Sequence, residues 1–277
     1  MAEYINPYYP QKSKILNTYF ESQDRSLKTF DIKPIESKVP EFIPGQFCEV
    51  SIGGYGESPF GIATSPTEKD FLRFTVNKAG FLTSKLHELS KGSYVGIRGP
   101  LGNGYPLDRF KGNNIVIVGG GFAFTTLRSL LVFMLHNRND FKDITVLYGA
   151  RTPDLFLYKD ELKEWEKRDD VDLVLTIDKP YEGWNKKVGL VPPVLEEMSP
   201  SPVESYAVVC GPPIMIKFTL PVLFKLGFKP DRIYTSLEKR MKCGIGKCGR
   251  CNVGHKYICK DGPVFSFEEL NKLPEDL

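Results

Sequence analysis

Four cysteines lie close together near the end of the sequence. They are Cys243, Cys248, Cys251 and Cys259, which gives the spacing C-x4-C-x2-C-x7-C. The other two of the six cysteines stand far from this group and far from each other. Disulfide frameworks are typical of short secreted chains, whereas a tight group of cysteines in a longer chain from a reducing compartment is typical of metal ligation. The spacing therefore predicts that the end of the chain folds around a metal centre.

The same spacing indicates which metal centre this is. C-x4-C-x2-C followed by a more distant cysteine is the arrangement that holds a 2Fe–2S cluster in plant-type ferredoxins. In a loop that wraps two irons and two sulfides, the backbone must come close to the cluster. Gly244, Gly246 and Gly249 allow this close approach and let backbone N–H groups point at sulfur. Such hydrogen bonds raise the reduction potential of a cluster. A structural zinc site and free thiols are the alternatives, but zinc loops usually carry two short cysteine or histidine pairs.

The composition excludes several classes of function. The 277 residues carry 37 Lys and Arg against 34 Asp and Glu, a formal charge of +3. This near-balance gives no electrostatic basis for binding nucleic acid or an anionic membrane surface. No segment is long and apolar enough to span a bilayer, and the first residues lack the basic and apolar regions of a signal peptide. We therefore expect a cytoplasmic protein with neither a nucleic-acid nor a membrane partner.

The hydrophobic pattern changes near residue 110. Before it, residues 27–32, 47–52 and 71–76 alternate and are separated by turn residues, which predicts a small antiparallel β-barrel with one helix near 83–89. After it, buried runs at 114–118, 144–148, 171–177 and 206–210 alternate with helical stretches, one of them at 159–167, which predicts a doubly wound parallel sheet. The expected fold is thus multi-domain α+β, with a barrel in residues 1–110, an α/β domain in 111–236 and a cysteine-rich tail in 237–277.

A glycine loop marks the α/β domain as nucleotide-binding. Gly119, Gly120 and Gly121 end a buried strand and open a helix, where backbone N–H groups and the helix dipole can hold a pyrophosphate. Thr125, in the first turn of that helix, is counted with the loop. Arg151 follows the second strand and could meet the 2′-phosphate of NADP or equally face solvent, so NAD and NADP are not distinguished.

A second motif lies at the end of a later strand of the same sheet. Cys210, Gly211 and Pro212 come directly after the run at 206–210, and ligands of open α/β sheets bind at the carboxyl ends of strands. Cys210 could face a nicotinamide as a small polarizable group, and we take it as the candidate catalytic residue. A buried core thiol is the equally weighted alternative.

The barrel offers a place for a flavin. Residues 58–61 could lay a backbone edge and an aromatic ring along it, and residues 77–83 offer a cation, a glycine turn and a hydroxyl before a helix. The predicted contacts are Ser58, Pro59, Phe60, Gly61, Asn77, Lys78, Gly80, Leu82 and Thr83. A flavin exchanges electron pairs with a nicotinamide and single electrons with a cluster, so it belongs between them.

This order of motifs resembles the ferredoxin–NADP reductase superfamily, in the branch with a C-terminal 2Fe–2S domain. That branch includes the electron-transfer subunit of dihydroorotate dehydrogenase, sulfhydrogenase gamma subunits and the corresponding subunit of anaerobic sulfite reductase. Segments 237–249 and 257–265 are most similar to the last two, and 99–104 and 211–215 match as well. The resemblance implies FAD, a 2Fe–2S cluster and NAD or NADP, with electrons passed to other subunits of a redox complex of hydrogenase, heterodisulfide reductase or sulfite reductase type.

The sequence departs from the superfamily pattern in two places. The flavin motif Arg-x-Tyr-Ser/Thr is replaced by residues 58–61, which removes an arginine, and Ala123 stands at a usual glycine position of the nucleotide loop. A relay or assembly subunit that binds flavin and cluster but no nucleotide is therefore the alternative to an NAD(P)H-dependent diaphorase subunit. A zinc-stapled nucleotide-binding module is a third hypothesis.

Overall fold

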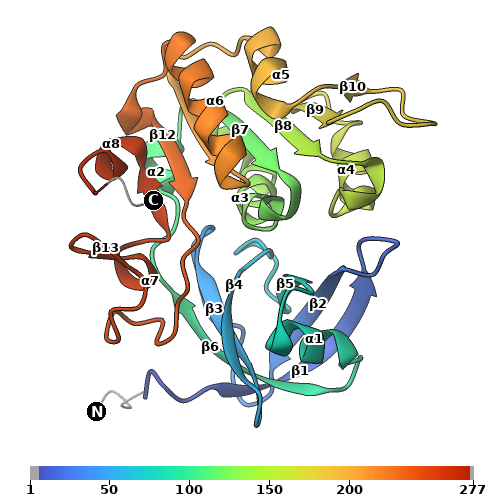
Figure 1. The fold of residues 1–277 in the computed structure, drawn as a ribbon, viewed down its shortest axis with the longest axis vertical. Helices are drawn as coiled ribbons and strands as arrows, with labels where there is room; N and C mark the ends of the chain where they lie inside the picture. Colours follow the sequence, from blue (N-terminus) through green and yellow to red (C-terminus); the bar gives the residue numbers. More distant parts are fainter. Residues whose placement is uncertain (1–5, 275–277) are drawn as a thin grey trace.

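The computed structural model describes residues 6–274, so positions 1–5 and 275–277 of the expected first and third domains lie outside the described residues. Two large sheets dominate it, one antiparallel and one mainly parallel. Figure 1 shows the parallel sheet and its helices above the antiparallel domain, with the cysteine-bearing tail at the side of both. In the described range, no helix combines the length and the apolar character needed to cross a bilayer.

The antiparallel domain is a curled six-stranded sheet in the order β4-β3-β6-β1-β2-β5. Its strands are β1 (Gln11–Phe20), β2 (Leu27–Pro34), β3 (Phe47–Ile52), β4 (Gly56–Gly61), β5 (Leu72–Asn77) and β6 (Tyr94–Leu101). Helix α1 (Phe81–Glu88) closes one opening by inserting Leu82 and Leu86 into the core. The alternating pattern of the sequence thus correctly predicted β2, β3 and β5, because one face of each strand packs inward.

The second sheet has seven strands in the order β10-β9-β8-β7-β11-β12-β15. The strands are β7 (Asn114–Gly120), β8 (Ile144–Ala150), β9 (Asp172–Ile177), β10 (Lys187–Val188), β11 (Ser205–Cys210), β12 (Ile233–Ser236) and β15 (Val264–Ser266). All neighbours pair parallel except β15, which runs antiparallel to β12. The continuous apolar runs reflect burial on both faces, as expected for parallel strands covered by helices.

Helices cover both faces of this sheet, which confirms the doubly wound prediction. They are α2 (Leu107–Phe110), α3 (Phe124–His136), α4 (Lys159–Trp165), α5 (Val191–Met198) and α6 (Pro213–Lys225), with single turns η1 (Gly121–Ala123), η2 (Arg138–Asp140), η3 (Pro153–Leu155) and η4 (Pro230–Arg232). Residues Ile115 and Ile117 pack with α3 and α4, whereas the alternate residues Val116 and Val118 pack with α5 and α6.

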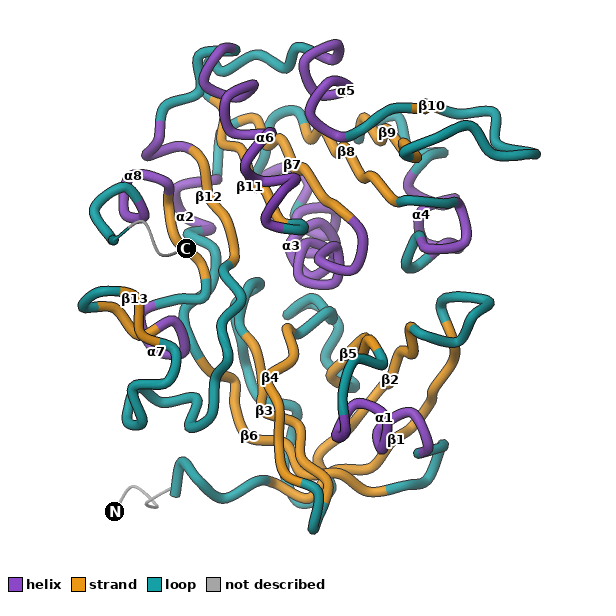
Figure 2. Tube along the Cα trace, in the orientation of Figure 1, coloured by secondary structure: helices purple, strands orange, loops and turns teal. Residues whose placement is uncertain are grey.

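The cysteine-rich tail contains several short strands and helices that were not predicted from the sequence. It contains β13 (Asn252–Val253), β14 (Lys256–Tyr257), α7 (Ile258–Asp261), β15 and α8 (Phe267–Leu270), and Figure 2 shows loops linking them. Strand β15 extends the parallel sheet, which the sequence reading missed. The reason is tertiary: Val264 and Phe265 are buried against the core of the α/β domain, a context that three residues alone cannot reveal.

A buried arginine holds the two large domains together. Arg128 of α3 is 2% exposed, and all five of its N–H groups donate hydrogen bonds. They reach Glu161 of α4 at 2.6 Å, Glu68 of the antiparallel domain at 2.9 and 3.0 Å, and the carbonyl of Ala63 at 2.6 Å. A fully satisfied guanidinium of this kind fixes relative position, because any displacement leaves charges unpaired away from water.

Replacing Arg128 by methionine is expected to lower the free energy of unfolding by about 3–5 kcal/mol, because two carboxylates then lose their buried partner. Urea unfolding of the holoprotein measures this. The matched control is K163A on α4, which removes only the exposed pair with Asp160 and should cost about 1 kcal/mol or less. Equal stability of R128M and K163A would contradict the assigned role.

Candidate functional site

The carboxyl ends of β7 and β11 face the edge strand β4 of the antiparallel domain. Thr126, in the first turn of α3, is the point of contact: a Cβ added to Gly61 would collide with its side chain. Its hydroxyl also lies 3.5 Å from the sulfur of Cys210, at the end of β11. The predicted flavin strand and the predicted nucleotide loop therefore meet at one place.

Thr126 was missed by the sequence reading, which chose its neighbour. The Thr125 side chain is only 6% exposed and packs inside, whereas Thr126 reaches the boundary between the domains. The sequence signal was present as two adjacent threonines, but the rotation of the helix decides which one faces the barrel.

Strand β4 presents an unpaired edge at the predicted flavin position. Because β4 is an outer strand, its backbone pairs with β3 on one side only, and the other row of N–H and C=O groups is free for a planar ligand. Ser58, Pro59, Phe60 and Gly61 all lie in this strand and are half-buried. This arrangement fits a flavin ring laid along the strand.

The second flavin segment lies at the start of α1. Gly80 caps the helix with extended backbone, and a Cβ there would meet nothing within 4 Å, so open space surrounds it. The Thr83 hydroxyl accepts hydrogen bonds from the N–H groups of Ala79 and Gly80 at 3.0 and 2.8 Å. The first helical turn then offers its own N–H groups outward, a suitable partner for a pyrophosphate.

The other residues of this segment differ in exposure. Asn77 and Lys78 are exposed at the end of β5, whereas the Leu82 side chain is buried, so only its backbone can meet a ligand. A cavity of about 480 Å³ opens beside Lys78. Its lining is Phe20, Asp24, Arg25, Ser26, Lys78 and His87.

The three glycines of the predicted nucleotide loop differ in what surrounds them. A Cβ at Gly119 would strike Phe124, and one at Gly120 would strike Met215, so both positions serve close packing of strand and helix. Gly121 has a positive φ of 54° and open space around its would-be Cβ. It is the glycine of the loop that leaves room for a ligand backbone.

Cys210 is a buried, neutral thiol. It is 4% exposed, and burial raises the pKa of its thiol to about 11. A thiol in this state is no nucleophile at neutral pH. The following Gly211 is half-buried and Pro212 is the exposed cap of α6, while Arg151 is exposed directly after β8. These positions all lie at the carboxyl edge of the sheet.

The four clustered cysteines come together in the tail. Cys251 and Cys259 are buried, Cys243 is half-buried and Cys248 is exposed. Gly244, Gly246 and Gly249 all have positive φ, between 70° and 72°, as the loop prediction required. Side chains at the first two would also collide, with Leu101 at 2.6 Å and with Lys260 at 2.9 Å.

Backbone N–H groups in the loop point at the cysteine sulfurs. Lys247 and Cys248 donate to the sulfur of Cys243 at 3.3 and 3.4 Å, and Gly246 donates to that of Cys259 at 3.1 Å. Burial acts to raise the pKa of the Cys243 thiol, but backbone hydrogen bonds outweigh it and lower the pKa to about 6. Thiolate is the form that ligates metal, so Cys243 is prepared for ligation. Burial and the neighbouring Cys251 instead raise the pKa of the Cys259 thiol to about 12.

The sulfurs stand as two pairs. The N–H of Cys248 donates to the sulfur of Cys243 at 3.4 Å, and the N–H of Cys259 donates to the sulfur of Cys251 at 3.4 Å. Two thiolates for each of two irons is the ligand set of a 2Fe–2S cluster, so the donors fit that group. Within the described part of the chain, no three His, Cys, Asp or Glu side chains are arranged around one common metal-ion position.

Charged side chains of the antiparallel domain lie beside this loop. Arg98 of β6 is 4% exposed and donates to the carbonyl of Cys243 at 2.8 Å. Glu49 of β3 pairs with Arg98 in register and is 1% exposed, yet neither of its carboxyl oxygens has a hydrogen-bond partner among the described residues. Burial and the neighbouring Glu57 raise the pKa of Glu49 to about 7, although Arg98 opposes this.

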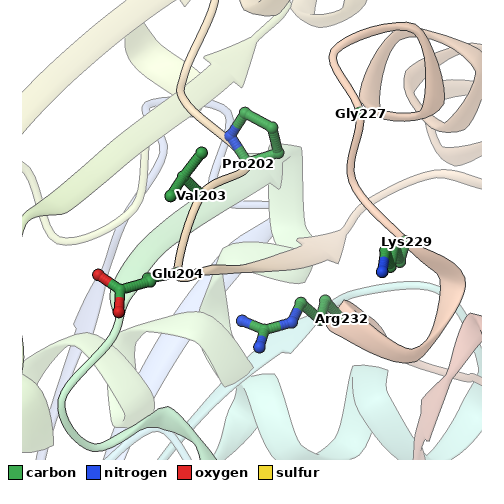
Figure 3. A pocket seen from close by; sticks show the side chains of 6 residues that line it. All are labelled: Pro202, Val203, Glu204, Gly227, Lys229 and Arg232. Atoms are coloured by element: carbon green, nitrogen blue, oxygen red, sulfur yellow. The ribbon is translucent and has the colours of Figure 1, made fainter.

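A second cavity, of about 290 Å³, lies away from all these residues. Figure 3 shows the side chains that line it: Pro202, Val203, Glu204, Gly227, Lys229 and Arg232. They precede β11 and β12, at the amino end of the sheet. None of the predicted site residues is among them, so the cavity is not part of the site.

Comparison with known families identifies two parts of the chain. Residues 117–220 match the profile of the oxidoreductase NAD-binding domain. Residues 238–271 match that of the iron-sulfur cluster binding domain of dihydroorotate dehydrogenase B.

Curated relatives extend over nearly the whole chain. Sulfhydrogenase 1 subunit gamma of Pyrococcus furiosus is 35% identical, over 97% of this chain and 94% of its own length. A probable dihydroorotate dehydrogenase B (NAD(+)), electron transfer subunit, of Thermococcus kodakarensis is 38% identical, over 83% of this chain and 87% of its own.

Solved structures share the fold. The structure of an NADH-dependent reduced ferredoxin-NADP oxidoreductase, described for flavin-based electron bifurcation, covers 100% of this chain and 92% of its own with a TM-score of 0.76 and 26% identity. A ferredoxin NADP+ reductase from Neisseria gonorrhoeae with bound FAD and NADP covers 81% and 97%, with a TM-score of 0.69. At 18% identity, the second similarity concerns the fold alone.

Replacing Cys251 by serine is expected to lower bound iron and acid-labile sulfide about tenfold or more, because one iron loses a thiolate ligand. Chemical analysis of iron and sulfide in purified protein measures this. C48A, which removes a buried thiol of the antiparallel core, is the matched control and should keep both. A C251S protein with full iron and sulfide, or wild-type protein with zinc in their place, would contradict the assignment.

Glu49 should make the protein less stable as the pH rises. Its pKa is raised from 4.5 to about 7 on folding, so the folded state holds a proton that the unfolded state releases, and stability falls between these two pH values and stays low above them. E49Q should remove the part of the slope that Glu49 contributes and stabilise the protein at pH 8 by roughly 3 kcal/mol.

Thermal unfolding of the holoprotein from pH 4.5 to 8 tests this, with the exposed Glu41 changed to glutamine as the control. An E49Q profile parallel to that of wild type would exclude the effect.

Proposed function

Because the chain belongs to the family of electron-transfer subunits that includes the sulfhydrogenase gamma subunits and the dihydroorotate dehydrogenase B electron transfer subunits, we propose that it moves electrons between NAD(P)H and a partner redox enzyme through FAD and a 2Fe–2S cluster. It is an oxidoreductase subunit with an NAD-binding domain and an iron–sulfur-binding domain. In the proposed division, residues 1–110 bind FAD, 111–236 bind NAD(P) and 237–277 bind the cluster.

One observation carries this function: the antiparallel domain contacts both other sites. Its strand β4 meets the nucleotide loop through Gly61 and Thr126, and its strand β6 meets the cysteine loop through Arg98 and the Cys243 carbonyl. A flavin supplies two-electron exchange with nicotinamide and one-electron exchange with an iron–sulfur centre when bound between them. The domain that would hold it has the required central position.

The residues would act by binding and orientation. The open edge of β4 and the start of α1 would hold the FAD, and Gly121 would give the nucleotide room at the sheet edge. The neutral Cys210 thiol and the Thr126 hydroxyl would border the nicotinamide and set its place over the flavin. No protein acid or base is needed in this scheme.

The proposed cofactor contacts keep all the sequence predictions and add Thr126. For FAD they are Ser58, Pro59, Phe60, Gly61, Asn77, Lys78, Gly80, Leu82 and Thr83; for the nucleotide they are Gly119, Gly120, Gly121, Thr125, Thr126, Arg151, Cys210, Gly211 and Pro212. The proposed cluster ligands are Cys243, Cys248, Cys251 and Cys259.

The backbone geometry at Ala123 helps to choose between the proposed function and its alternative, a relay subunit that binds no nucleotide. Ala123 has right-handed helical backbone, with φ −66° and ψ −10°, so the backbone conformation there does not require glycine. Together with the NAD-binding profile over 117–220, this favours the nucleotide-dependent function.

We propose that the partner is another subunit of a cytoplasmic redox complex. A hydrogenase-type partner is favoured, because two sulfhydrogenase gamma subunits match over 94% and 96% of their lengths; heterodisulfide reductase and sulfite reductase types are further possibilities. The exposed Cys248 would bring the cluster to the surface between the exposed Lys247 and Arg250, where a partner could dock.

Anaerobic addition of NADH or NADPH should bleach the flavin band and then reduce the cluster, and G121A should raise the KM for the nucleotide about tenfold. An alanine there combines a strained positive φ with a methyl group in the ligand space. The control is G183A, where φ is also positive and space is open but no site lies near.

Dithionite should reduce wild type and both variants alike. Absence of bleaching by either nucleotide in wild type would reject the diaphorase function and leave the relay function.

A further inference from the structure

We propose that Arg98 is the positioning residue of the iron–sulfur site: its buried charge raises the reduction potential of the cluster and fixes the ligand loop on the flavin domain. The inference rests on the proposed function, since it requires that the four cysteines hold the cluster. It assigns a role to a residue outside the cysteine motif, on a strand that lies about 145 positions away along the chain.

The guanidinium is held at the loop by several bonds. One terminal nitrogen donates to the carbonyl of Cys243 at 2.8 Å and to that of Pro7 at 3.1 Å. A Cβ on Gly244 would lie 3.4 Å from the same nitrogen, so the loop packs directly on the guanidinium. With 4% exposure, this charge is screened little by water or salt.

The other side of Arg98 is bound to the flavin strand. Its Nε and second terminal nitrogen donate to the two carboxylate oxygens of Glu57 at 3.3 and 2.8 Å. Glu57 lies in β4 and directly precedes Ser58, a proposed FAD contact. A bidentate pair is geometrically specific, so the ligand loop and the flavin strand are joined through one rigid group.

The effect on potential has a defined sign. Reduction adds one negative charge to the cluster, and a nearby positive charge stabilises the reduced form. Arginine stays charged at all accessible pH values, so its influence persists. Removing Arg98 leaves the Glu57 carboxylate without its partner beside the loop, which acts in the same direction and lowers the potential further.

A second contact holds the tail through uncharged groups, so it separates the effect of the Arg98 charge on the potential from the effect of fixing the loop. The Asn103 amide donates to the carbonyls of Asp261 and Val264 at 3.1 and 2.8 Å, and accepts from the N–H of Val264 at 2.9 Å. These bonds fix the chain just after Cys259. N103A should therefore loosen the tail and speed loss of the cluster while leaving its potential nearly unchanged.

The experiment is a redox titration of the holoprotein at one fixed pH, with the cluster followed by EPR and the flavin by absorbance. At a fixed applied potential, R98M should have an about tenfold lower ratio of reduced to oxidised cluster. For a one-electron couple this corresponds to a cluster potential that is lower by about 59 mV. R98K should show less than half that shift, and E57Q should shift the potential upward. The flavin potential should shift less than the cluster potential in the Arg98 and Glu57 variants, and R138M, far from the site, should match wild type.

Several outcomes would overturn the inference. One is an R98M protein that keeps full iron and sulfide and has the wild-type cluster potential. Another is an equal shift of the cluster potential in R98M and N103A. If R98M retains no cluster, E57Q decides: an upward shift supports the role of the charge, and an unchanged or lower potential excludes it. Wild-type protein without iron would instead overturn the proposed function itself, whereas a wild-type cluster insensitive to Arg98 would overturn this inference alone.

Discussion

The buried ion pairs of Arg128 are the interaction on which the arrangement of the site depends. Arg128 lies on α3 only two residues after Thr126, so the bonds that fix it to Glu68 and Ala63 also fix the glycine loop against the flavin strand. Hydride transfer between two rings tolerates little error in their distance and orientation. For the proposed function, a rigid boundary between the domains is therefore needed for electron transfer as well as for stability.

A similar logic applies at the other side of the antiparallel domain. The cysteine loop would supply the proposed cluster ligands, and its own N–H groups donate to their sulfurs, but it has few apolar side chains with which to hold its position. The flavin domain compensates with polar contacts, from Arg98 to the Cys243 carbonyl and from Asn103 to the chain after Cys259. Both boundaries are thus joined by planar, multiply hydrogen-bonding groups, whose geometry is more specific than that of apolar packing.

Prediction from sequence succeeded where the signal is local. The alternation in 47–52 and the buried runs at 114–118 and 206–210 gave β3, β7 and β11, because burial on one or both faces imposes its period on the residues. The spacing of the cysteines and glycines predicted a loop whose backbone does have positive φ at Gly244, Gly246 and Gly249. Strand β15 was missed because its three residues gain strand geometry only by pairing with β12.

The sequence by itself thus determined the two domain types and predicted the proposed nucleotide loop and the proposed ligand set of the cluster, since each depends on residues close together in the chain. Only the tertiary structure decided that Thr126 rather than Thr125 faces the flavin strand, that Gly121 alone of its loop borders open space, and that Glu49 and Arg98 lie beside the cysteines. These facts depend on helix rotation and on contacts between segments over a hundred residues apart. No local pattern of residue types encodes such contacts.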